Sequence, residues 1–328
     1  MNVHTTVFSK KGNWYKGNLH THTVLSDGKA SVEQMVDVYR CAGYHFLSIT
    51  DHNIFQAYSQ FSDGQFLMLP GTELTPGFDM EDGELMGAMA AHQRGEFVWS
   101  EAAPSLRKKI AALCDAHVLA ISRQETGVSW KAEPQRLNSI QNMINYAFQR
   151  DCISIVAHPA WSKLDSQALV YLKGYAAIEV YNHVSHPWAE SSLLWDSMLN
   201  KGLHVFALAS DDSHELQDAC GGYMMLKAES LTHGKVIEAI EHGDYYSSCG
   251  PVINGFHRDG ETIVVQCSAC KEVRFLTDNM FGKTYRSAEG DGLTRCEHKL
   301  FGDEAYVRVE VVDGQGLKAW TNPIFLEE

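Results

Sequence analysis

The sequence predicts an α/β fold for residues 1–250 and a small all-β domain for residues 251–328. Up to residue 250, short β-rich runs alternate with segments whose apolar residues have helical spacing, which is typical of a parallel sheet or barrel. From residue 251 onwards, strand-like runs such as GETIVVQC and AYVRVEVVDG are separated by turns, without a convincing helix. We therefore expect a sandwich-like domain after the α/β domain.

The first strand–helix unit contains the stretch GNLHTHTVLSDG, residues 17–28, followed by a well-marked helix. In SVEQMVDVYRCAG the apolar residues recur at the spacing of one helical face. Ser31 and Gln34 have the spacing of a capping box, in which each side chain bonds to the other residue's backbone N–H. Gly43 suits the end of this helix, because glycine readily adopts the left-handed conformation found there.

The later units repeat the alternation of strands and helices. HFLSIT, FLMLPGTEL, ISIVAHP, AAIEVYN and HVFALAS are strand-like, whereas NSIQNMINYAFQ, AESSLLWDSMLNKG and VIEAIEHG have helical patterns. In parallel α/β folds, chemistry collects at the C-terminal ends of the strands. The predicted strand ends carry the polar residues Asp51, His52, Glu73, His158, Asn182, Asp211, Asp212 and His214.

Residues 77–135 fit this alternation poorly. GFDMEDGELMGAMAAHQRGEF is rich in glycine and acidic residues, and the stretch after it has mixed signals. We expect an insertion or lid over the site here, rather than part of the barrel core.

His20 and His22 lie two residues apart in a predicted strand, so their imidazoles point to the same side. Two converging imidazoles suit a borderline metal ion such as Zn2+, Mn2+ or Fe2+. Taken alone, such a pair is also found on surface strands that bind nothing. The His, Asp and Glu residues at the other strand ends favour the metal site.

Five ordered motifs, HTH with SDG, TDHN, PGTE, AHP and SDDSH, resemble those of the PHP (polymerase and histidinol phosphatase) superfamily over roughly residues 15–250. The resemblance implies a distorted (β/α)7 barrel that holds up to three divalent metal ions at its strand ends. It also implies a hydrolase, since members of this superfamily are mostly phosphoesterases.

The resemblance assigns metal-ligating roles to residues of these motifs. His20 and His22 match the pair on a first metal, Asp27 and His52 match ligands of another, and Glu73 matches the carboxylate that bridges metals. The remaining matches are His158, in the third histidine motif, and Asp212 and His214, in the closing DxH motif. Beside these ligands, Asp51 and Asp211 are expected to orient imidazoles by hydrogen bonds.

One position departs from the family pattern. Many members have a further histidine about ten residues beyond the bridging glutamate, where this chain reads DMEDGELMGAM. Glu84 stands near that place and is the favoured substitute, since carboxylates suit Mn2+ and Mg2+. His92 is the other candidate. The alternative for Glu84 is a solvated residue of an acidic loop.

The C-terminal runs YYSSCGPVI, YVRVEVVDG and KAWTNPIFL resemble the tail of a carbaryl-hydrolase-like branch, in which a small β-sandwich follows the barrel. Within this tail, a zinc site is one interpretation of the cysteine and histidine spacing, and core packing of the thiols is the other. The residues concerned are Cys267, Cys270, Cys296 and His298.

The expected reaction is hydrolysis of a small-molecule phosphate ester by metal-bound hydroxide, using two or three ions of Mn2+, Zn2+ or Fe2+. Asp212 or His214 would handle the proton. Three cations, Lys29, Arg123 and Lys163, are weaker candidates for binding phosphate. Asn182, His183 and His186 follow a strand end and either line the pocket or form a loop without a chemical role.

Other functions remain open at this stage. The same chemistry suits a carboxylic ester, amide or carbamate hydrolase, and a third class is a non-catalytic PHP binding module, which the filled ligand positions disfavour. The formal net charge of −14 and the lack of a basic run disfavour a nucleic-acid polymer. No signal peptide or membrane span is visible, and eight scattered cysteines form no disulfide framework, so we expect a cytoplasmic protein. A homo-oligomer is compatible with the sequence.

Overall fold

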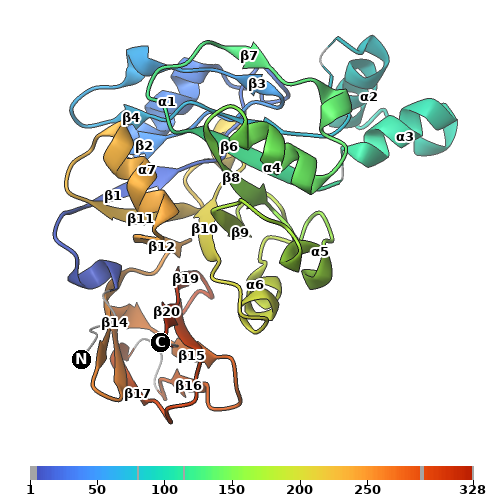
Figure 1. Ribbon diagram of the computed structural model, residues 1–328. Coiled ribbons are helices and arrows are strands. Elements are labelled where there is room, and N and C mark those ends of the chain that lie inside the picture. Colours follow the sequence, from blue (N-terminus) through green and yellow to red (C-terminus); the bar gives the residue numbers. More distant parts are fainter. Residues whose placement is uncertain (1–5, 80, 114, 289–291, 327–328) are drawn as a thin grey trace.

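The computed structural model describes residues 6–79, 81–113, 115–288 and 292–326 (Figure 1). Met80 and Cys114, which belong to the predicted insertion, lie outside the described residues. The described chain has a mixed α/β architecture, as the sequence predicts, and its α-helices all precede residue 250. None of these helices combines the length and apolarity needed to cross a membrane.

A ring of short strands forms the centre of the α/β part. Its strands are β1 (Asn13–Asn18), β2 (Phe46–Leu47), β4 (Leu67–Met68), β5 (Gly71–Leu74), β6 (His117–Ser122), β8 (Cys152–Ala157), β9 (Ala177–Asn182) and β10 (Phe206–Ser210). β1, β2 and β4 pair in parallel in one sheet, and β8, β9 and β10 pair in parallel in another. Isolated parallel bridges, Thr21 to Ser213 and His52 to Glu73, join the two sheets. The ends of several strands are thereby brought together.

The ring departs from a regular succession of β–α units. β6 pairs antiparallel with both β5 and β8, and β11 (Tyr223–Ala228) pairs antiparallel with β1. Buried Leu119, Ile155 and Leu208, from three different strands, fill the core inside it.

Five helices accompany the ring: α1 (Val32–Cys41), α4 (Ile140–Phe148), α5 (Ser166–Val170), α6 (Ser192–Leu199) and α7 (His233–Glu241). The predicted capping box is confirmed, since the Gln34 backbone N–H donates to Ser31 Oγ and the Ser31 N–H donates to Gln34 Oε1. Gly43 has φ +74°, as expected of a residue that ends a helix.

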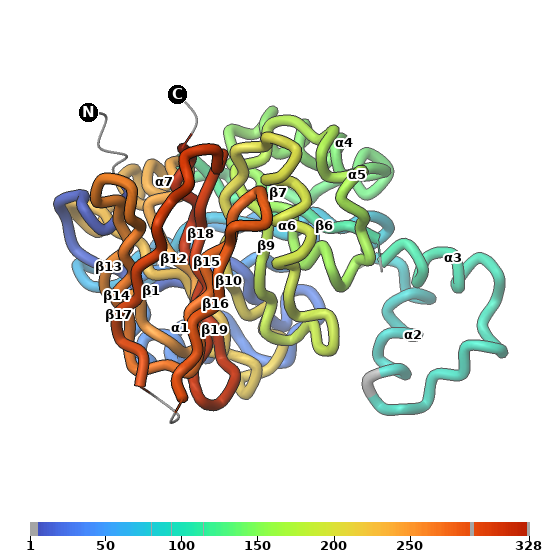
Figure 2. The backbone as a smooth tube through the Cα atoms, turned by 90° about the horizontal axis from the view of Figure 1, so that it is seen from below, coloured from blue at the N-terminus to red at the C-terminus, as the bar shows by residue number. Residues whose placement is uncertain are grey.

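The predicted insertion is only partly outside the core. Its helices α2 (Gly83–Gln93) and α3 (Pro104–Ala112) project from the rest of the molecule, and we call residues 81–113 the arm (Figure 2). β6 also lies within residues 77–135, but it is a fully buried central strand, so the expectation that this whole segment lies outside the core is wrong. Also in this segment, β7 (Trp130–Lys131) pairs antiparallel with β3 (Ile54–Phe55) in a separate two-stranded sheet.

The described residues from 253 onwards form strands and no helix. These strands are β13 (Ile253–Asp259), β14 (Thr262–Cys270), β15 (Glu272–Thr277), β16 (Lys283–Arg286), β17 (Leu293–Lys299), β18 (Tyr306–Val312), β19 (Lys318–Thr321) and β20 (Ile324–Phe325). β13, β14 and β17 form one layer, and an apolar core that includes Phe256 and Val309 separates it from β15 and β18.

This C-terminal part is continuous with the α/β part. β19 pairs antiparallel with β12 (Tyr245–Ser248), so a single sheet runs from β16 through β18 and β19 to β1 and β4. The fully buried Arg308 of β18 donates two hydrogen bonds of 2.7 Å to Asp196 of α6. A buried charge needs such partners, so the two parts depend on each other.

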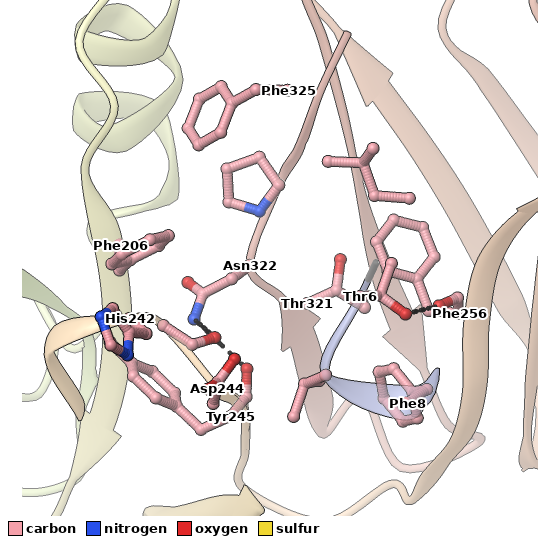
Figure 3. A pocket seen from close by; sticks show the side chains of 14 residues that line it. Thr6, Phe8, Phe206, His242, Asp244, Tyr245, Phe256, Thr321, Asn322 and Phe325 are labelled. Carbon is pink, nitrogen blue, oxygen red and sulfur yellow. Dashed lines mark hydrogen bonds between the residues drawn. The ribbon is translucent and has the colours of Figure 1, made fainter. Parts of the chain in front are cut away.

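A cavity of about 260 Å³ lies at this junction (Figure 3). Asn322 bridges its walls, because its Nδ2 donates to the carbonyl oxygens of Gly243 and Tyr245, and its Oδ1 accepts from the Ala207 N–H. These polar contacts tie the last strands to the end of α7 and to β10.

Candidate metal centre

Histidines and carboxylates meet where the parallel strands end. His20 and His22 follow β1, His52 follows β2, Glu73 lies in β5, His158 follows β8, and Asp212 and His214 follow β10. Their ligand atoms form three overlapping groups in which all atoms lie within 4.8 Å of one another. The groups are His22, Asp27, His52 and His214; His20, His22, Glu73 and Asp212; and His52, Glu73 and His117.

Glu73 lies at the centre of the cluster and is fully buried. Its Oε2 lies 3.3, 3.2 and 2.9 Å from ring nitrogens of His20, His22 and His52. Its Oε1 lies 2.9 Å from His117 Nδ1 and 3.1 Å from His158 Nε2. One carboxylate thus touches imidazoles from every side, which is the geometry expected of a bridging ligand.

Two aspartates complete the cluster. Asp212 Oδ1 lies 3.1 and 3.0 Å from Nε2 of His20 and His22. Asp27 Oδ2 lies 3.5 Å from His52 Nε2 and 3.4 Å from His214 Nε2. Each aspartate therefore faces a pair of imidazoles on a different side of the cluster.

The donor atoms fit divalent cations. Nε2 of His20, Nε2 of His22 and Oε2 of Glu73 are buried and have no hydrogen-bond partner, although they face one another. Buried polar atoms without a partner are costly unless an ion satisfies them. Imidazole and carboxylate donors together suit Mn2+, Fe2+ and Zn2+.

The protonation of the cluster supports the same interpretation. Burial alone would lower the pKa values of His20 and His52, but the neighbouring carboxylates raise them well above the usual value. Asp27 and Asp212 likewise outweigh burial and raise the pKa of His214 to about 9. Burial would raise the pKa of Glu73, yet the surrounding imidazoles hold it well below its usual range. Cations binding here therefore have to displace protons.

His117 is a member of the cluster that the sequence analysis missed. It opens β6, with Nδ1 against Glu73 and Nε2 donating to the carbonyl oxygen of Leu113 over 3.0 Å. His117 lies 44 residues beyond Glu73 in the sequence, although the two side chains are in contact. The apolar run VLAI that follows His117 is the signal of a buried strand that could have revealed it.

Glu84 does not join the cluster, which corrects the prediction for this residue. It lies in the first turn of α2, its side chain is 49% exposed, and it contacts Lys109 of α3 at 3.5 Å. An exposed carboxylate gains more from water and a neighbouring cation than from a buried site. His92, the other candidate, lines the cavity described below.

Glu179 is a second residue that the sequence analysis missed. It is fully buried in β9, where its carboxylate accepts hydrogen bonds from His20 Nδ1, the His158 backbone N–H and Asn182 Nδ2 at 2.8, 2.8 and 2.9 Å. It fixes the orientation of His20 from behind. A glutamate inside the apolar run AAIEVYN was the available signal, because a buried charge needs a partner.

Asp51 and Asp211 act on loops rather than on imidazoles, contrary to the prediction. Asp51 accepts hydrogen bonds from the backbone N–H and the hydroxyl of Thr23, at 2.7 and 2.8 Å, and from Ser26. Asp211 accepts from the Tyr39 hydroxyl and from backbone N–H groups of residues 220–222. Both carboxylates hold chain segments that carry or flank the cluster residues.

The other candidate residues divide between the site and the surface. Asn182 reaches the cluster, because its Nδ2 lies 3.3 Å from Asp212 Oδ2. His183 points to Tyr181 instead, with 3.2 Å between Nδ1 and the hydroxyl. The predicted phosphate-binding cations do not line the cavity: Lys29 pairs with Glu215, Arg123 pairs with Glu241, and Lys163 is exposed.

The cysteines of the tail do not gather around a common point with His298. Cys267, Cys270 and Cys296 are buried in the core between the two layers, and His298 stacks on Phe275 with ring centroids 5.2 Å apart. Among the described residues, metal-sized groups of ligand atoms occur only at the strand-end cluster. Core packing, the second interpretation of this spacing, agrees with the structure.

A cavity of about 710 Å³ opens above the cluster. Asp27, His52, Glu73, His117 and His214 lie on its floor, and Ala88, Met89 and Ile110 of the arm form part of its wall. The cluster is therefore accessible to a small molecule that enters beneath the arm.

Comparisons with known proteins find similarity to solved structures only; no family model and no curated protein matches the chain. One similar structure is a two-domain protein from Bacteroides vulgatus containing a predicted PHP-like metal-dependent phosphoesterase, with a TM-score of 0.45, 15% identity and 94% of each chain covered. PsfC from Pseudomonas syringae has a TM-score of 0.40 and 14% identity over 66% of this chain and 83% of that one. An amidohydrolase from Chromobacterium violaceum, solved with bound sulfate and no metal, has a TM-score of 0.35 and 14% identity over 61% and 87%.

Proposed function

We propose that this protein is a PHP-type metal-dependent hydrolase with a distorted barrel, acting on small-molecule phosphate esters. The observation that carries the proposal is the buried Glu73, which contacts His20, His22, His52, His117 and His158 on the floor of an open cavity. A cluster of this composition has no role in packing, because so many buried titratable groups cost stability unless they bind an ion.

The three groups of ligand atoms are the proposed binding sites of two or three ions of Mn2+, Fe2+ or Zn2+. Such ions, when bound, activate water and polarise the electrophilic centre of an ester. Glu179 and the Leu113 carbonyl oxygen orient His20 and His117 from behind, so that the opposite ring nitrogens face the site.

His214 belongs to one of these groups, but we assign it to proton transfer, which leaves His22, Asp27 and His52 to hold the cation there. Its Nδ1–H donates to the carbonyl oxygen of Asp212 over 2.7 Å, which leaves Nε2 facing Asp27 and the cavity. With its side chain 30% exposed, it is the most accessible imidazole of the cluster and can exchange protons with solvent. Asp212, whose Oδ1 lies between two imidazoles, is assigned to the cations, although it also lines the cavity.

A carboxylic ester, amide or carbamate hydrolase is the second candidate. Among the described residues that line the cavity there is no lysine or arginine. Sites that select phosphate usually add such cations to the metals. A neutral carbonyl centre would need none of them.

The two candidates are separated by the group that is hydrolysed. Mn2+-loaded protein is offered p-nitrophenyl phosphate, bis-p-nitrophenyl phosphate and p-nitrophenyl acetate, with Asp212→Asn as the control variant. Turnover of a phosphorus ester that is lost in the variant supports the phosphoesterase and distinguishes a monoester from a diester substrate. Turnover of the acetate alone contradicts it and supports the second candidate.

A further inference from the structure

The wall of the active-site cavity is apolar over most of its height. Its side chains come from the arm, from the loops after β8 and β9, and from the segment after β5. They are Phe78, Ala88, Met89, Phe97, Trp99, Ile110, Leu113, Trp161 and Val184. The carboxylates that line the cavity, Asp27, Glu73 and Asp212, all belong to the cluster on the floor.

The apolar wall begins directly at the cluster. Phe78 packs over His52, with ring centroids 4.5 Å apart, and Trp161 lies edge-on to His158 at 5.0 Å. Leu113 belongs to both parts, since its side chain lines the wall and its carbonyl oxygen accepts the hydrogen bond from His117. A molecule whose reacting group lies on the floor must therefore place its remaining atoms against these side chains.

Such a wall selects by polarity. Among the described lining residues outside the cluster, the apolar side chains far outnumber the polar ones, which are Thr75, His92 and Ser185. Most hydroxyl or charged groups of a sugar phosphate or a nucleotide would therefore lose water without gaining partners there, whereas aromatic or branched alkyl groups would gain about 25 cal/mol per Å² of buried apolar surface. The apolar residues also extend outwards, because Trp99 is 49% exposed at the rim.

We propose that the substrate is an ester whose non-reacting part is an uncharged aromatic or branched alkyl group held beneath the arm. This inference rests on the proposed function for the reacting group, but the polarity of the wall is independent of whether that group is a phosphoryl or a carbonyl centre. The wall disfavours sugar phosphates and nucleotides.

The test uses two non-hydrolysable ligands with the same head group, methylphosphonate and 4-tert-butylbenzylphosphonate. Each is titrated calorimetrically into the Mn2+-loaded protein of residues 1–328. The aryl ligand should bind at least about a hundredfold more tightly, because it buries many more apolar carbons. Equal affinities, or no binding of the aryl ligand, would overturn the proposal.

Matched variants locate the binding surface. Met89→Gln in the arm should reduce the ratio of the two affinities at least about fivefold, whereas Met86→Gln, on the same helix but outside the cavity lining, should leave it unchanged. Val184→Asn changes the opposite wall, and should reduce the ratio even where substitutions in the arm disturb its folding. A ratio that responds equally to Met86→Gln and Met89→Gln, and not at all to Val184→Asn, contradicts a binding role of the cavity.

Failure of the proposed function gives a different result. Tight binding of the aryl phosphonate without hydrolysis of any phosphorus ester leaves the apolar subsite standing and refutes the phosphoesterase. Hydrolysis of phosphorus esters with no preference for the aryl ligand supports the phosphoesterase and refutes the apolar subsite.

Discussion

Three imidazoles of the cluster are held by a protein group on the side away from the ligand atoms. His20 donates to Glu179, His117 to the carbonyl oxygen of Leu113, and His214 to that of Asp212. Partners of this kind fix the tautomer and the orientation of a ligating histidine. The backbone contributes as well, because His158 and Asp212 adopt φ values of 28° and 58°, which are strained for residues with a side chain.

Substitutions of His117 and of Glu84 should differ in how strongly they weaken the binding of Mn2+. His117→Asn should weaken binding of Mn2+ at least about tenfold, because a buried nitrogen next to Glu73 is lost. Glu84→Gln should change the affinity less than about twofold, because this side chain is exposed and pairs with Lys109 rather than with a residue of the cluster. Calorimetric titration of both variants measures this. An effect of Glu84→Gln as large as that of His117→Asn would contradict the assignment.

At the scale of elements, local patterns in the sequence were informative and long-range pairings were not. The capping box of α1 and the polar ends of β2, β5, β8 and β10 follow from residue spacing, since both depend on neighbours in the chain. β6 was missed because its antiparallel pairing with β5 and β8 breaks the β–α alternation. His117 was lost with it, whereas the exposed position of Glu84 agrees with the alternative interpretation of an acidic loop.

Glu179 shows a different limit of sequence analysis. The strand AAIEVYN was identified, but which side of a fully buried strand faces the site depends on the sheet around it. The partners of Glu179 come from β1, β8 and β10, which are distant in sequence. The role of Glu179 therefore becomes visible only when these distant segments are seen together in the fold.

The arm has a small apolar core of its own, made by Leu85, Ala88 and Leu106. We expect Leu85→Ala to open the arm locally, because the substitution removes about 2–4 kcal/mol of packing from a unit that projects from the molecule (Figure 2). Hydrogen exchange should accelerate in residues 83–112 while the melting temperature stays nearly constant. Leu119→Ala in β6 is the matched control and should lower global stability by about 2–5 kcal/mol. Equal global losses in both variants would show that the arm is not an independent unit.

For the whole molecule, the proton balance of the cluster sets a pH dependence. Without metal, His20, His52 and His214 have pKa values raised above the usual histidine value, that of His214 to about 9. Groups of this kind stabilise the folded state below pH 6.5, and their contribution is lost as the pH rises towards 9. The melting temperature in EDTA should therefore fall between pH 6.5 and 9.

Bound metal should counteract this fall in melting temperature with rising pH, because cations bind the neutral imidazoles. The gain in melting temperature on adding Mn2+ should grow over the same pH interval. A melting temperature in EDTA that rises with pH, or a gain from Mn2+ that shrinks, would contradict the protonation described for the cluster.

The central claim is that the strand-end cluster binds divalent cations through Glu73. The most direct test is a calorimetric titration of EDTA-stripped protein with Mn2+, comparing the natural chain with Glu73→Gln after circular dichroism has shown that both are folded. We predict saturable binding of two or three ions per chain, and loss of most of this binding in the variant. Absence of saturable binding, or the same stoichiometry and affinity in Glu73→Gln, would contradict the claim.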